Sequence, residues 1–182
     1  MISYGAIHEA GHAVVAAHLR VPFTHVTIKG TGELGGYVRC KQMTMHAASF
    51  NARTGEAHWK SAGEIEKEKR RQVENNAIMI LAARCAVDAF FKPAVTARLE
   101  DSYGFDEKNL ASLASMLAVP CFDQWRTELL DCARQIVYMP HVKHAILLVS
   151  LDLEAAHQKK KGISSKHVRE VLREELAQAR AC

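Results

Sequence analysis

The chain has 182 residues, of which 48% are hydrophobic and 24% charged, a balance typical of a globular protein rather than a disordered one. Its net charge of +4 comes from 24 basic and 20 acidic residues, an excess too small to indicate nucleic-acid binding. The five cysteines include no CxxC pair and are scattered among apolar residues, so we expect reduced thiols in a cytoplasmic protein.

The first forty residues predict a helix followed by a small sheet. The helix extends from about Tyr4 to Leu19, because Ser3 is a suitable N-cap residue and Pro22 ends the pattern. Its apolar residues give it one buried side. A strand is predicted at His25–Ile28, and a glycine-rich turn separates it from a second strand at Tyr37–Cys40.

The middle of the chain predicts a loop and then the longest helix. Residues 42–60 show no clear period and are interpreted as a loop. A helix from Ser61 to Phe91 follows, polar at its start and buried later. Its apolar stretch contains Arg84 and Asp88 and is too short to cross a bilayer, so we expect no membrane segment.

The rest of the chain is predicted to be a loop over residues 93–105 and then a run of helices, with prolines marking their boundaries. We therefore expect a mostly helical α+β fold in one domain, 1–182. The first helix and small sheet occupy residues 1–41, the loop 42–60, and the helical part 61–182. The later helices are expected at Asp106–Leu117, Phe122–Tyr138, His141–Gln158 and Ser165–Ala179.

The segment His8-Glu-Ala-Gly-His12 is an HExxH motif on the first predicted helix. Residues four apart lie on one helix face, so both imidazoles can reach one zinc ion. Glu9 is rotated by about 100° and can accept a proton from a water molecule on the metal. Gly11 costs the helix about 1 kcal/mol relative to alanine, which predicts close packing of another backbone or a ligand. The alternative interpretation is an ordinary helix carrying two histidines by chance.

Two histidines do not complete a catalytic zinc site, which needs a third protein ligand. The extended form HExxHxxGxxH is absent, and His18 lies too far around the helix from His12. The third ligand must come from far along the chain. The carboxylate candidates are Asp88, Glu100, Asp101 and Asp106.

Several segments together resemble the peptidase domain of FtsH-type zinc metalloproteases. His8–Ala13 matches that family's HEAGHA motif, and the strand at His25–Ile28 and the Leu-Gly step in Glu33–Gly36 follow as they do there. Weaker similarities cover most of the remaining chain: Leu81–Ala86 is similar to the family's GGRAAE helix, Phe105–Ala111 to its NDxxxA segment, and Gly162–Leu172 to its last helix.

The resemblance implies a helical zinc peptidase domain with one Zn²⁺ per chain. It implies that His8, His12 and Asp106 bind the metal and that Glu9 is the general base. It further implies that an extended polypeptide substrate pairs with the edge strand after the zinc helix. In this sequence that strand contains Gly35, Gly36, Tyr37 and Val38.

The sequence also departs from the family. It contains neither the AAA+ ATPase module nor the membrane-spanning segments that normally precede the peptidase domain, and it has Val87-Asp88 in place of a Glu-Glu pair. We expect a zinc endopeptidase that cuts unfolded or flexible polypeptides, with a separate unfoldase or adaptor as a further partner and oligomers compatible with the sequence. The alternatives are a non-cleaving zinc-binding regulatory or interaction module, and a domain of a larger ATPase-protease.

Overall fold

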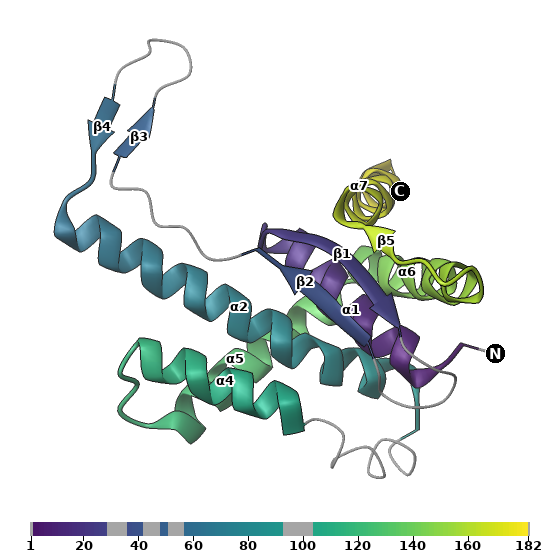
Figure 1. Cartoon of the computed structure of the whole chain (residues 1–182), viewed down its shortest axis with the longest axis horizontal. Helices are drawn as coiled ribbons and strands as arrows, with labels where there is room; N and C mark the ends of the chain where they lie inside the picture. Colours follow the sequence, from purple (N-terminus) through teal and green to yellow (C-terminus); the bar gives the residue numbers. More distant parts are fainter. Residues whose placement is uncertain (1, 29–35, 42–47, 51–56, 93–103, 182) are drawn as a thin grey trace.

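A central helix, α1 (Tyr4–His18), organises the computed structural model, which describes residues 2–28, 36–41, 48–50, 57–92 and 104–181. Ser3 caps this helix, as predicted, by accepting a hydrogen bond from the Ala6 amide over 3.2 Å. The sequence indicated one buried side, yet residues 5–16 are all buried. The sheet covers one face of α1, and three other helices cover the rest (Figure 1).

The sheet that covers α1 has three antiparallel strands in the order β2-β1-β5. The two predicted strands are confirmed as β1 (Phe23–Ile28) and β2 (Gly36–Cys40). The third, β5 (Ile163–Ser164), was not predicted, because two residues are too few to show an alternating pattern. Within the described ranges β2 is an edge strand, so one side of its backbone is not paired in the sheet.

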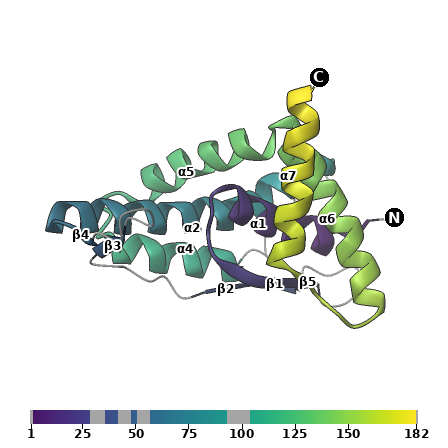
Figure 2. The same cartoon turned by 90° about the horizontal axis from the view of Figure 1, so that it is seen from above.

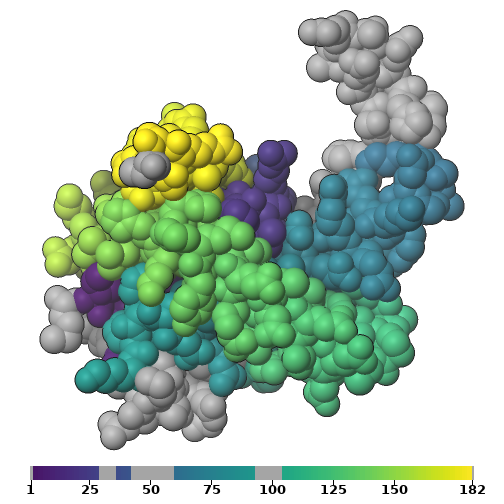
Figure 3. Space-filling view, turned by 180° about the vertical axis from the view of Figure 1, so that it is seen from behind, coloured from purple at the N-terminus to yellow at the C-terminus, as the bar shows by residue number. Residues whose placement is uncertain are grey.

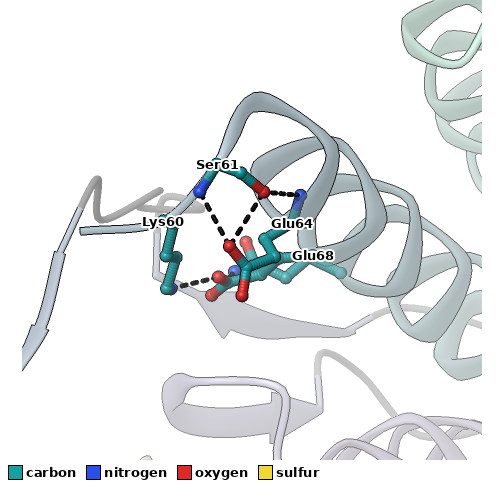
Figure 4. A network of polar contacts seen from close by, with 5 residues as sticks. Lys60, Ser61, Glu64 and Glu68 are labelled. Carbon is teal, nitrogen blue, oxygen red and sulfur yellow. Dashed lines mark hydrogen bonds and ion pairs between the residues drawn. The ribbon is translucent and has the colours of Figure 1, made fainter. Parts of the chain in front are cut away.

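Helix α2 (Ala62–Phe90) confirms the long helix predicted after residue 60. It begins in a capping box, in which Ser61 Oγ accepts from the Glu64 amide over 3.3 Å and Glu64 Oε2 accepts from the Ser61 amide over 2.7 Å (Figure 4). An ion pair between Lys60 and Glu68 lies beside this cap. The first turns are largely exposed and the buried residues of the helix lie between Val73 and Val87, as its polar start predicted.

The loop predicted at residues 42–60 is wrong in part. Two three-residue strands, β3 (Ala48–Phe50) and β4 (Ala57–Trp59), pair there as an antiparallel sheet. They extend beyond the N-terminal end of α2, away from the sheet on α1 (Figure 1). Residues 42–47 and 51–56 lie outside the described part of the chain. Strands this short carry no periodic signal that sequence reasoning can detect.

Four further helices lie in the described part of the chain, and the fold is mostly helical α+β, which is the predicted class. Two pack against α2 and two pack against or beside α1 (Figure 2). From behind, the later helices spread over one face of the molecule (Figure 3). The predicted loop at 93–105 lies mostly outside the described residues. The helices are α4 (Gly104–Met116), α5 (Phe122–Val137), α6 (Pro140–Gln158) and α7 (Ser165–Ala181).

Among the described helices, no single one has the length and apolar content needed to cross a membrane. One pair, α5 with α6, passes that test by length and composition when the two are taken together, although they are bent by 81° at their junction.

Candidate metal centre

Three side chains that the sequence singled out meet between α1 and α4. The Nε2 atoms of His8 and His12 lie 3.1 Å apart, and Asp106 Oδ2 lies 3.3 Å from the first and 3.5 Å from the second. Among the described residues this is the one cluster of histidine, cysteine and carboxylate groups close enough to share a metal ion. Of the other carboxylate candidates, Asp88 is exposed on α2, and residues 100 and 101 lie outside the described ranges.

The spacing of these three atoms fits a tetrahedral ion. Zinc binds histidine nitrogen and carboxylate oxygen at about 2.0–2.2 Å, so two ligand atoms of a tetrahedral site lie about 3.3 Å apart. The three observed separations fall within a few tenths of an ångström of that value. Two imidazoles and one carboxylate are also a donor set found in catalytic zinc sites, where the fourth position stays open.

The ring of His12 is held in place by the main chain of α2. His12 Nδ1 donates a hydrogen bond to the carbonyl oxygen of Met79 over 2.9 Å. This bond places the second ring nitrogen, Nε2, toward His8 and Asp106, and histidines that bind metals commonly have such a partner on the far nitrogen. Sequence reasoning missed Met79, because a backbone carbonyl acceptor has no side-chain signature.

Charge in the metal-free cluster is unevenly distributed. Burial lowers the pKa of His8, although Asp106 opposes this. Burial also opposes a charge on His12, but the charge and hydrogen bond of Asp106 outweigh it and raise the pKa of His12 to about 9. Burial opposes the charge on Asp106, but the charge and hydrogen bond of His12, together with the contact to His8, hold the pKa of Asp106 well below its usual range. In the metal-free cluster a positive charge is therefore favoured on His12 rather than on His8.

Glu9 lies beside the cluster and faces the same cleft. Its side chain is only 4% exposed, and its Oε2 atom has no hydrogen-bond partner among the described residues. Burial raises the pKa of Glu9 to about 7, and the positive charge on His12 partly opposes that shift. A buried carboxylate oxygen without a partner is costly unless a water molecule or a ligand group meets it, so this atom indicates where a polar ligand belongs.

Gly11 confirms the close packing that the sequence predicted at this position. A Cβ atom on Gly11 would lie 2.7 Å from Ala86 Cβ and 3.1 Å from Ala83 Cα, both on α2. These distances are shorter than van der Waals contact, so only glycine lets the two helices approach this closely. The approach brings the α1 histidines within reach of the Met79 carbonyl.

The cluster opens into a cleft of about 470 Å³ bordered by β2 on one side and α4 on the other. The predicted substrate segment begins outside the described residues at position 35, but Gly36, Tyr37 and Val38 all line the cleft. The strand that borders the cleft is thus one of the two edge strands of this sheet within the described residues. The rest of the lining comes from Cys40, Asn76, Met79, Ile80, Phe105, Asn109, Ser112 and Leu113, besides the cluster and Glu9.

No family model matches the chain, and no curated protein matches it. The similarity to FtsH-type peptidases therefore stays a prediction from the motifs.

Proposed function

We propose that this protein is a zinc-dependent endopeptidase. The observation that carries the proposal is the triangle formed by His8, His12 and Asp106, whose sides match the spacing of ligands around tetrahedral zinc. Two further features support it. Glu9 has a buried oxygen that faces the cleft without a partner, and the cleft is open along the edge strand β2.

In this proposal Glu9 moves the proton. A buried carboxylate beside the metal cluster can accept a proton from the attacking water and pass it to the nitrogen of the cleaved amide. The oxygen of that water bonds to the amide carbon, the C–N bond breaks, and a carboxylic acid and an amine result. When bound, zinc would supply a Lewis acid that polarises the carbonyl and makes water more acidic. His12, fixed by Met79, would keep the geometry rigid.

The substrate would be a polypeptide in extended conformation. An edge strand offers unpaired amide and carbonyl groups, and an extended peptide can add to it as a further strand. Because β2 borders the cleft, a peptide paired with it would pass directly over the metal cluster. A folded domain cannot present its backbone in this way, so we propose flexible or unfolded segments as substrates, with a separate unfoldase or adaptor supplying them where needed.

The experiment is cleavage of an unstructured polypeptide such as casein by the zinc-loaded protein and by Glu9→Gln. Glu9 is not a ligand in this proposal, so the variant should retain one zinc per chain and lose at least about a hundredfold in rate. Glu175→Gln is the matched control, since Glu175 is the other buried glutamate of the described residues and lies outside the cleft. Full cleavage by Glu9→Gln would contradict the mechanism.

The same experiment separates the non-cleaving alternative. Stoichiometric zinc in the wild-type protein, with no cleavage of any unstructured substrate, would point to a zinc-binding interaction module instead. Absence of zinc after purification and after reconstitution would contradict both functions.

A further inference from the structure

Gly36, the first residue of β2, lies directly against the side chain of Glu9. A Cβ atom at Gly36 would lie 2.6 Å from Glu9 Cγ and 2.8 Å from Glu9 Cδ. It would also lie 2.4 Å from the main-chain oxygen of Thr27, on the neighbouring strand. All three distances are far below van der Waals contact, so any side chain at Gly36 would have to displace the Glu9 carboxylate, the strand, or both.

The way in which Glu9 is held makes this contact important. Its Oε2 atom has no hydrogen-bond partner among the described residues, so that oxygen is not fixed by a polar contact. A glutamate side chain has several rotatable bonds, and restricting them costs up to about 2 kcal/mol. Packing contributes to this restriction, because the bare backbone of β2 at Gly36 lies against the last two carbons of the side chain.

We propose that Gly36 is a positioning residue for Glu9. Its lack of a side chain lets the backbone of the edge strand form a wall that holds the carboxylate in the cleft. This inference rests on the proposed function and adds a second role for β2, beyond pairing with the substrate. The strand that would bind the substrate through its unpaired side also fixes the general base through the face that it turns to α1.

Gly162 offers a matched control, because it lies against β1 on the side away from β2. A Cβ atom at Gly162 would lie 2.6 Å from the Val26 main-chain oxygen and 2.6 Å from Thr27 Cγ2. Gly162→Ala therefore crowds β1 about as severely as Gly36→Ala does. Gly162 does not line the cleft and its added Cβ would not meet Glu9. A difference between the two variants reports on the Glu9 contact rather than on damage to β1.

The first measurement needs neither metal nor activity. Protein labelled with ¹³C at glutamate Cδ gives one carboxyl resonance per glutamate, and Glu9→Gln identifies the resonance of Glu9. In the metal-free protein, Gly36→Ala should shift that resonance and Gly162→Ala should leave it in place. An unshifted Glu9 resonance in Gly36→Ala, or an equal shift in both variants, overturns the proposal.

The second measurement uses the zinc-loaded protein and an unstructured substrate. Gly36→Ala should retain its zinc and lose roughly tenfold to a hundredfold in kcat, because small displacements of a catalytic group are costly, while KM changes little. Gly162→Ala should keep its kcat. A rise in KM with kcat unchanged would assign Gly36 to substrate pairing alone. If the wild-type protein cleaves nothing, the proposed function fails, and the carboxyl resonance still decides the position of Glu9.

A double-mutant cycle covers the case in which Gly36→Ala is too unstable to assay. Glu9→Ala removes the two side-chain carbons that the new Cβ would meet and leaves only the contact with Thr27. The double variant should therefore be more stable than Gly36→Ala alone, as measured by thermal unfolding. If the double variant fails to fold as well, Gly36 serves only the pairing of β1 with β2, and the proposal is wrong.

Discussion

His12 on α1 donates a hydrogen bond from Nδ1 to the main-chain carbonyl of Met79 on α2, over 2.9 Å. The bond joins the two described helices with the most buried residues, since residues 5–16 of α1 are all buried and the ten buried residues of α2 lie between Val73 and Val87. It fixes the ring before any ligand is present. A preorganised imidazole of this kind needs no rearrangement when a metal binds.

Replacement of Asp106 tests the third ligand. Asp106→Asn should lower zinc affinity by at least about tenfold, because the carboxylate charge is lost from a partly buried cluster. Asp88→Asn is the control, since Asp88 is exposed on α2 and takes no part in the cluster. Competition with a chromogenic chelator measures both affinities. Equal affinities in the two variants would assign the third ligand to another residue.

Zinc binding should release a proton from His12. With a pKa of about 9, His12 is protonated in the metal-free protein near neutral pH, and zinc requires the neutral ring. We expect release of about one proton per ion at about pH 7.5, falling toward zero at about pH 10. Calorimetric titration in buffers with different ionisation enthalpies measures this number. Release that does not vary with pH would show that His12 is already neutral.

The metal-free protein should lose stability as the pH rises from about 7 to about 10. A histidine whose pKa is raised on folding stabilises the fold fully below its unfolded value of 6.5, and this contribution disappears as the pH passes about 9. The raised pKa of Glu9 acts in the same direction, between 4.5 and about 7. His8, whose pKa is lowered, adds nothing in this window. Thermal unfolding at several pH values measures the effect, which Asp106→Asn should flatten.

Gly11→Ala should destabilise the protein by about 1 kcal/mol. The added methyl group would collide with Ala86 and with the α2 backbone, and overpacking of this kind costs about 1–3 kcal/mol, against a gain of about 1 kcal/mol in helix propensity. Gly63→Ala is the control, because nothing lies within 4 Å of a Cβ there. That substitution should stabilise α2 slightly. Denaturant unfolding measures the free energy of unfolding of both variants. Equal effects would mean that α1 can move away from α2 to accommodate the methyl group without loss of stability.

Much of the frame could be predicted from local patterns. The cap at Ser3, the start of the long helix near Ser61 and the two strands on either side of the glycine-rich turn all depend on residues close together in sequence, where periodicity and caps are informative. The enclosure of α1 on every side was not predicted, because it depends on helices far along the chain. The short strands β3 and β4 were missed since they have no period.

The site was predictable only in part. His8, Glu9 and His12 share one helical turn, so their convergence follows from helix geometry. The residues alone left four carboxylates open as the third ligand, and only the family resemblance selected Asp106, which the structure places beside both histidines. The hydrogen bond to the Met79 carbonyl and the contact between Gly36 and Glu9 both involve backbone atoms that tertiary packing brings together. No pattern of side chains in the sequence predicts such contacts.

The candidate ligands of the centre come from two helices that differ greatly in burial. His8 and His12 lie on the enclosed helix α1, whereas Asp106 lies on α4, which buries only Leu110 and Ala114 and packs chiefly on α2. An ion held by all three would fasten a peripheral helix to the centre of the molecule. Removing it would free α4, which forms one wall of the cleft, long before it disturbed α1. Metal occupancy and the width of the cleft would then change together.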